Sequence, residues 1–198
     1  MEKSMKRNLI YFITFIFSMI SCAVSYASEE KYTIDPQHSF VVWRVDHLGF
    51  STQTGKWPAN GFIFLDKNDL AKSKVDVTIK INSLVTGIAE LNKHLETPLF
   101  FDATKYPTAT FVSQKINLVS KDTADIQGNL TLHGETKPVT LHVHLNKIGQ
   151  NPVNDKMSVG FSADTAINRS DFGIKGFLPM VGDKVHLVID VEAQKDSK

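Results

Sequence analysis

The sequence predicts an all-β protein with antiparallel strands, and three observations support this. Most of the chain alternates apolar and polar residues with a period of two, which is typical of strands with one buried face. The runs 123–132 and 138–148 are separated by a short turn and therefore predict a hairpin. Only the stretch 83–111 fits neither pattern, so we expect it to cap the β-structure.

Residues 1–27 are predicted to be a secretory signal peptide. Three basic residues precede an apolar run over 9–20, and small residues follow up to Ala27. A run of this length is short for a membrane span and typical of a signal peptide. We therefore expect export to the periplasm and a single domain over residues 28–198.

The single cysteine, Cys22, lies inside this expected signal. Lipoprotein processing at Cys22 is the alternative, but Met19 stands where such sites usually have Leu. Without the signal the chain has no cysteine, which excludes disulfides and thiolate chemistry. The 22 basic and 21 acidic residues nearly balance and form no basic run, which argues against a nucleic-acid partner.

Taken in order, the alternating runs predict eight strands. In the first run, Val41, Trp43 and Val45 share one face, and His47 continues it. The expected strands are 41–45, 61–65, 75–81, 108–116, 123–132, 138–148, 157–163 and 185–191. Eight such strands can form a sandwich or close as a barrel, which is either filled by side chains or holds one small ligand. The alternation leaves this choice open.

The stretch between the third and fourth strands predicts a short helical lid over residues 86–97. Ile88, Leu91 and Leu95 have helical spacing, Thr86 is the expected N-cap, and Pro98 ends the run. Two adjacent rings, Phe100 and Phe101, then follow among turn residues. Such rings either pack the end of a core or line a ligand cavity.

Three histidines share the predicted outward face of the hairpin. His142 and His144 stand two apart on one strand, and His133 belongs to its partner. Three imidazoles can bind a metal, but this face is polar and no carboxylate or cysteine accompanies them with ligand spacing. We therefore predict no metal and no cofactor.

Few other residues suggest chemistry. The inward His47 is either a hydrogen-bonded core histidine or a polar group in a cavity. Arg169 and Asp171 either fix a turn as an ion pair or form the polar end of a pocket, and we favour the turn. No nucleophile elbow, phosphate loop or paired-carboxylate motif occurs, so we predict a protein that is not an enzyme.

Several short motifs together resemble a known family. They are His38-Ser39-Phe40, Trp43-x-Val45-x-His47-Leu48-Gly49, Gly55-x-Trp57, Asn92-Lys93-His94-Leu95, Phe100-Phe101-Asp102, Lys105-Tyr106-Pro107-x-Ala109-Thr110-Phe111, Gly128-Asn129-Leu130-Thr131-Leu132-His133-Gly134 and Asp171-Phe172-Gly173. In this order and spacing the chain resembles the YceI-like family from Tyr32 to Ala193. Members are exported bacterial proteins with a lipocalin-like barrel that bind polyisoprenoids or related amphiphiles.

The resemblance implies an eight-stranded antiparallel lipocalin-like barrel around one ligand. The implied ligand is a polyisoprenoid, an isoprenoid quinone or a fatty amphiphile. We expect polar side chains to orient its head and aromatic side chains to form the walls. The candidate ligand-binding residues are Trp43, Val45, His47, Phe50, Trp57, Phe62, Phe64, Asn92, His94, Phe100, Phe101, Phe111, Phe161 and Phe172.

The lid departs from the family pattern at two places. Leu91-Asn92 stands where the family often has Arg-Asp, and Leu99 where it often has Asp. This less charged lid favours a neutral head group such as a quinone, alcohol, amide or protonated fatty acid. Two alternatives stay open: a quinone-handling accessory of a membrane b-type cytochrome, and a structural or stress protein with a filled barrel. The resemblance also makes a homodimer and a transient membrane contact plausible.

Overall fold

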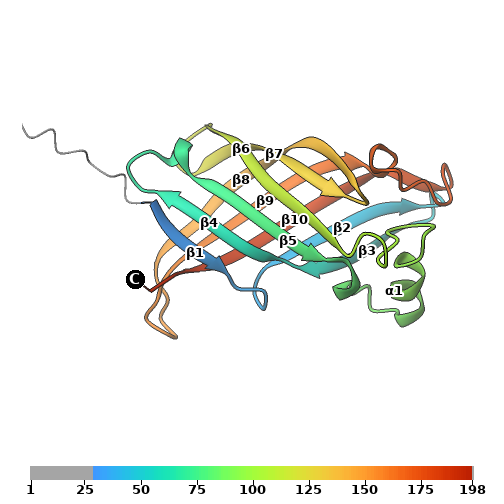
Figure 1. The fold of residues 1–198 in the computed structure, drawn as a ribbon, viewed down its shortest axis with the longest axis horizontal. Coiled ribbons are helices and arrows are strands. Elements are labelled where there is room, and N and C mark those ends of the chain that lie inside the picture. The colour runs from blue at the N-terminus through green and yellow to red at the C-terminus, as the bar shows by residue number, and fades with distance from the viewer. Residues whose placement is uncertain (1–28, 198) are drawn as a thin grey trace, which may run out of the picture.

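The computed structural model describes residues 29–197, so the expected signal peptide and Cys22 lie outside the described residues. Ten strand segments, one short α-helix and three 3-10 helices make up this part of the chain (Figure 1). The strands are β1 (Glu29–Ile34), β2 (Phe40–His47), β3 (Ser51–Pro58), β4 (Asn60–Asp66), β5 (Lys74–Lys80), β6 (Thr108–Leu118), β7 (Thr123–Leu132), β8 (Glu135–Gln150), β9 (Met157–Asn168) and β10 (Val181–Lys195). The helices are α1 (Ala89–Leu95) and the 3-10 turns η1 (Leu70–Lys72), η2 (Ile81–Ser83) and η3 (Arg169–Phe172).

The strands close into an antiparallel barrel, which confirms the predicted fold and decides against a sandwich. The ring runs β1-β4-β5-β6-β7-β8-β9-β10, and β10 returns to β1 to close an eight-stranded barrel. β10 is long enough to pair with β1 over Ala193–Lys195 and with β2 over Val181–Asp190. β1 and β2 therefore lie end to end along β10, and β3 extends the sheet from β2.

Two strands, β1 and β3, were not among the eight predicted. β3 reads STQTGKWP and carries only one large apolar residue, Trp57, so it lacks the alternating apolar face. β1 is short and offers only Tyr32 and Ile34 to the interior. The pairing of both strands is set by neighbours far away in the sequence, and local alternation does not report it.

The lid covers the place where the ladder of hydrogen bonds is interrupted. On its free side, β3 is joined only by an isolated bridge to the segment that follows η2, in which Lys56 and Val85 exchange two backbone hydrogen bonds of 2.9 Å. The segment from η2 to Pro107 leaves the barrel wall here, and α1 lies at this end of the barrel in Figure 1. We call this end the lid end.

Within the lid, the predicted helix is confirmed but its predicted start is wrong. α1 begins at Ala89, and Ile88 occupies the N-cap without a side-chain bond. The Thr86 hydroxyl instead donates to the Asn92 side-chain oxygen at 2.7 Å. Gly87, with φ of 85°, separates Thr86 from the helix because the chain turns there before it becomes helical.

The apolar side chains inside the barrel form three separate clusters rather than one continuous core. One lies under the lid, one at the opposite end and one along the wall between β6 and β7. Their buried members are Trp43, Val45, Trp57, Leu84, Leu95, Phe100 and Ile174; Tyr32, Ile34, Ile63, Leu65, Val159 and Ala193; and Phe111, Ile116 and Ile126.

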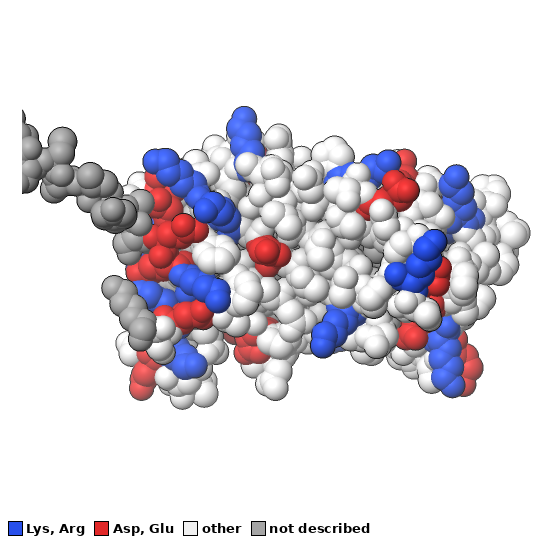
Figure 2. Space-filling model, viewed as in Figure 1, with Lys and Arg blue, Asp and Glu red and all other residues white. Residues whose placement is uncertain are grey.

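The end opposite the lid is held by charged groups. Glu30 accepts hydrogen bonds from Lys195, from Lys67 at 2.8 Å and from the Tyr32 hydroxyl at 3.1 Å. The two ammonium groups lower the pKa of Glu30 to about 2, Lys195 having the larger effect. Figure 2 shows this end densely covered by Lys, Arg, Asp and Glu.

We predict that Glu30→Gln lowers the free energy of unfolding by about 2 kcal/mol near neutral pH, because two cations lose their charged acceptor. The pKa of Glu30 is depressed in the folded state, so its stabilisation is present above pH 4.5 and is lost as the pH falls towards 2. Urea unfolding at several pH values should therefore show wild type and variant converging in acid.

A matched control is Glu29→Gln, since Glu29 is more exposed and pairs with Lys74 at 3.4 Å. A surface pair of this kind contributes about 0–1 kcal/mol. An effect of Glu30→Gln that was independent of pH, or no larger than that of Glu29→Gln, would contradict the account of this end.

Candidate ligand cavity

The barrel encloses a cavity of about 990 Å³ that extends from the lid end towards the opposite end. Small-molecule sites usually measure about 300–1,000 Å³, so this one is large. The cavity also explains why the apolar clusters are separate: the space between them is not filled by side chains. A filled barrel, one of the alternatives raised by the sequence, does not agree with this structure.

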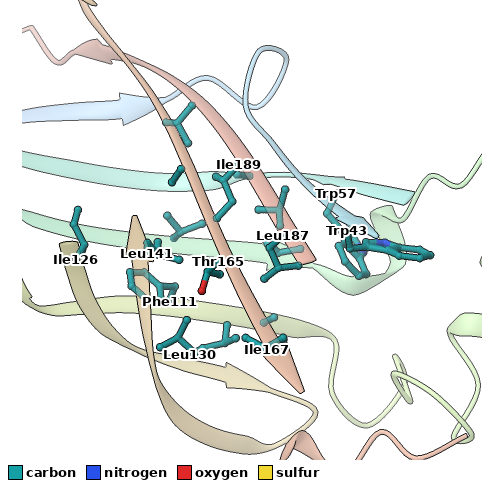
Figure 3. Close-up of a pocket in the computed structure, with 18 of the residues that line it drawn as sticks. Trp43, Trp57, Phe111, Ile126, Leu130, Leu141, Thr165, Ile167, Leu187 and Ile189 are labelled. Carbon is teal, nitrogen blue, oxygen red and sulfur yellow. The ribbon is translucent and has the colours of Figure 1, made fainter. Parts of the chain in front are cut away.

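The middle of the cavity is lined almost entirely by aliphatic side chains from alternating positions of the long strands. Figure 3 shows these side chains projecting inward, with the hydroxyl of Thr165 on β9 among them. They include Ile126, Leu130, Leu141, Ile167, Leu187 and Ile189. A wall of this kind offers dispersion contacts and almost no hydrogen bonds, so it suits a hydrocarbon chain.

At the lid end the wall becomes aromatic. The rings of Trp43 and Trp57 are 6.3 Å apart, and Phe101 from the lid meets Trp57 edge-on at 5.2 Å. His94 of α1 stands edge-on to Phe100 at 5.1 Å. The Trp57 indole N–H donates to the Ile81 carbonyl at 3.0 Å, which fixes β3 to the start of the lid segment.

The Trp43 ring lies against the backbone of Gly55 on β3. A Cβ at Gly55 would stand 2.6 Å from the indole, so only glycine leaves room for this ring. Within residues 29–197, the buried Trp43 Nε1 has no hydrogen-bond partner. An unpaired buried donor is uncommon in proteins and marks this part of the wall as a candidate polar contact.

Polar groups line the cavity at its two ends. Those at the lid end are His47, Gln53, His94 and Arg169, and those at the opposite end are Lys67, Ser73, Lys121, Asp122 and Thr123. The arrangement is therefore apolar in the middle and polar at both ends. It matches an amphiphile whose chain lies along the barrel axis.

Arg169 was predicted to pair with Asp171, and this is wrong. Its guanidinium is buried and donates to the backbone carbonyls of Gly182 at 2.8 Å, Val181 at 2.9 Å and Ile174 at 3.1 Å. Burial lowers the pKa of Arg169 from its ordinary value. Arg169 does fix the turn, as expected, but through the β9–β10 backbone rather than through an ion pair with Asp171.

Nine of the predicted ligand-binding residues line the cavity. They are Trp43, Val45, His47, Trp57, His94, Phe100, Phe101, Phe111 and Phe161. They come from β2, β3, the lid, β6 and β9, so the barrel brings together residues far apart in the sequence. Their contact with a ligand stays a prediction.

Three predicted residues point away from the cavity. Phe62 and Phe64 pack on each other outside the barrel, with ring centres 6.3 Å apart, and the Lys31 ammonium lies 3.7 Å from the centre of the Phe62 ring. Both faces of β4 are apolar, and the structure turns Ile63 inward instead. Phe50, in the β2–β3 turn, is 91% exposed.

Two further predicted residues serve the structure around the lid end. Asn92 accepts hydrogen bonds from both the backbone N–H and the hydroxyl of Thr86, and so it organises the start of the lid. Phe172 is buried but lies outside the cavity lining, and its carbonyl accepts a bond from His133 at 3.0 Å. Neither residue is placed to touch a ligand in the cavity.

Sequence reasoning missed the aliphatic members of the wall, such as Leu187 and Ile189. They stand on predicted inward faces, where an aliphatic side chain is as typical of a packed core as of a cavity wall. It also missed Gln53, which lies on the unrecognised strand β3. The residues of the cavity wall can be found by taking the inward-facing positions of each strand and assuming that the strands close into a barrel.

The histidines of the hairpin are not gathered into one site. The His142 Nδ1 lies 2.8 Å from the Asp125 carboxylate, and the His144 Nδ1 lies 3.0 Å from the Asn146 side-chain oxygen. The ring of His133 packs on the ring of Tyr106. Across residues 29–197, no three potential metal ligands come together. In the same part of the chain, none of the helices has the length and apolar character needed to span a membrane.

Comparison with known proteins gives consistent matches over most of the chain. The family described as YceI-like domain matches residues 32–193. Protein YceI of Salmonella agona is 39% identical over 189 residues, which cover 95% of this chain and 97% of that protein. Protein YceI of Shigella flexneri is 40% identical over 189 residues, which again cover 95% of this chain and 97% of that protein.

Solved structures agree with this relationship. A Campylobacter jejuni YceI protein has a TM-score of 0.67 at 31% identity and covers 77% of this chain and 90% of its own. Burkholderia cenocepacia BcnA has a TM-score of 0.71 at 23% identity, and the match covers 80% of this chain and 98% of BcnA. A polyisoprenoid binding domain from Saccharophagus degradans has a TM-score of 0.62 at 16% identity, and the match covers 83% of this chain and 98% of that domain. The last two show the shared fold alone, whereas the match over residues 32–193 and the relatives near 40% identity show that this chain belongs to the YceI-like family.

Proposed function

We propose that this protein binds one long-chain isoprenoid, or a similar amphiphilic lipid, inside its barrel and does so in the periplasm. The observation that carries the proposal is the cavity of about 990 Å³ with an aliphatic middle. The family relationship supports it, since the structural relative from Saccharophagus degradans is described as a polyisoprenoid binding domain. The signal-like N-terminal sequence supports the location.

Burial of the chain supplies the affinity in this proposal. Each methylene transferred from water to an apolar wall contributes about 0.8 kcal/mol before ordering costs are subtracted. A ligand of many methylenes therefore binds without any reactive group. For this reason we propose binding and carriage rather than catalysis.

The head group is proposed to lie at the lid end, beside His47, Gln53 and His94. These side chains can donate to or accept from a carbonyl or hydroxyl group. Arg169 also lines this end, but three of its N–H groups are already used by backbone carbonyls. The arrangement favours a neutral head over a diphosphate.

An isoprenoid quinone is one member of this ligand class, because it joins a neutral carbonyl-bearing head to a long chain. The proposal therefore includes a quinone-handling role beside a membrane b-type cytochrome. A bound quinone that such a cytochrome reduces would favour this role over simple carriage.

We predict that Thr165→Trp prevents lipid binding, because an indole on this inward position of β9 would occupy the middle of the cavity (Figure 3). The matched control is Ala166→Trp, since Ala166 is the next residue and is exposed. Binding of geranylgeraniol by purified protein should fall about tenfold or more in Thr165→Trp only. Equal binding by both variants, with both folded in a thermal unfolding scan, would contradict a ligand in this cavity.

The lid rings give a second prediction. The double variant Phe100→Ala, Phe101→Ala removes two aromatic rings from the cavity wall at the lid end. It should weaken geranylgeraniol retention about tenfold or more. The control is His142→Ala, His144→Ala, which changes two exposed side chains outside the cavity. Dissociation rates measured for both variants test this. Equal retention would argue against a lid that holds the ligand.

A further inference from the structure

The lid end carries an exposed apolar surface around the mouth of the cavity. Leu48, Phe50, Leu99, Phe177 and Met180 form this surface, which we call the apolar rim. Phe50 is 91% exposed and the other four are about half exposed. They come from the β2–β3 turn, the lid and the β9–β10 loop.

Direct contacts join these three segments into one surface. The Leu48 N–H donates to the Met180 carbonyl at 3.0 Å, which links the turn to the β9–β10 loop. Gly176 lies so close to the lid that a Cβ there would stand 2.7 Å from the Leu99 carbonyl oxygen. The ring of Phe177 lies 6.1 Å from that of Phe100.

The apolar rim is continuous with the cavity. Leu48, Phe177 and Met180 are half exposed to solvent and also line the cavity. The interior therefore opens at this rim. An apolar molecule that leaves the cavity at the lid end meets these side chains before it meets water.

Two rim residues are held in an unfavourable backbone conformation. Leu48 and Phe177 have φ values of 61° and 57°, a left-handed region that bulky side chains rarely adopt. Such conformations persist where the surrounding structure enforces them, and they concentrate at functional sites. Here they coincide with apolar side chains presented at the surface.

The opposite end differs in charge. It also exposes the apolar side chains Leu118, Val119, Ile148 and Val153, of which Leu118 and Ile148 line the cavity, but ion pairs join Glu29 to Lys74 and Lys31 to Asp196 there. In Figure 2 that end is covered with charged side chains, whereas the tip of the lid end is uncharged in this view. The lid end is therefore the one suited to an apolar environment.

We propose that the apolar rim inserts into the interfacial region of a lipid bilayer, so that lipid passes between bilayer and cavity without crossing water. This proposal rests on the proposed function, because the long-chain lipid that the barrel is proposed to bind resides in a bilayer when it is not bound to protein. A bilayer fits the rim better than a protein does, since the rim has no charged side chain for recognition and is continuous with the cavity.

The flanking charges indicate which membrane is needed. Asp46, Glu90, Lys93, Glu96 and Lys175 lie beside the rim in the sequence or on the lid, and they do not share one sign. Attraction to anionic lipid is therefore not required. We expect binding to neutral phosphatidylcholine vesicles that depends little on ionic strength.

The test compares Phe50→Ser with Val153→Ser in purified protein. The two side chains are 91% and 90% exposed, at opposite ends, and neither lines the cavity. Co-flotation with isoprenoid-free phosphatidylcholine vesicles should fall about tenfold in Phe50→Ser, as for loss of an inserted aromatic ring, and stay at the wild-type level in Val153→Ser.

Binding of detergent-solubilised geranylgeraniol, measured beside flotation, separates this proposal from the proposed function. Both variants should bind it as wild type does. Vesicle binding without geranylgeraniol binding would overturn the proposed function alone. Geranylgeraniol binding without vesicle binding, equal flotation of the two variants, or wild-type self-association that Phe50→Ser abolishes would overturn the membrane role of the rim.

Discussion

The pairing of β1 with β10 is the interaction on which the rest of the structure depends. It joins the two ends of the described chain over three residue pairs, including Tyr32 with Lys195 and Ile34 with Ala193, and closes the ring. Closure removes the free edges of the eight barrel strands and turns one face of each of them inward. Because most inward side chains are medium-sized aliphatic residues, the closed ring leaves a cavity rather than a packed core.

The site lies where the regular barrel is interrupted. The free side of β3 is tied to the lid segment by the bridge between Lys56 and Val85, and the lid carries Phe100 and Phe101 into the cavity lining. A covering segment can open more readily than a hydrogen-bonded ladder, and for this reason the proposed ligand is expected to enter at the lid end. The opposite end is fixed by the ion pairs of Glu30. The two ends of the barrel therefore differ in how they are held, one by a covering segment and the other by ion pairs.

Alternation within single strands predicted much of the fold, because each inward face is recorded locally. It identified the long strands from β5 to β10 and the short helix in the lid. It was ambiguous on β4, where Phe62 and Ile63 are both apolar and only closure decides which faces inward. It could not reveal the cavity, which depends on ring size and side-chain volume together. The exposure of Phe50 likewise depends on the turn that presents it.

Native mass spectrometry of the protein, purified from its producing cells, tests the central claim most directly. The account predicts one long-chain lipid with a neutral head group bound to each chain, released when the protein is denatured. A preparation that carries no lipid, and gains none when offered isoprenoid alcohols or quinones, would contradict it.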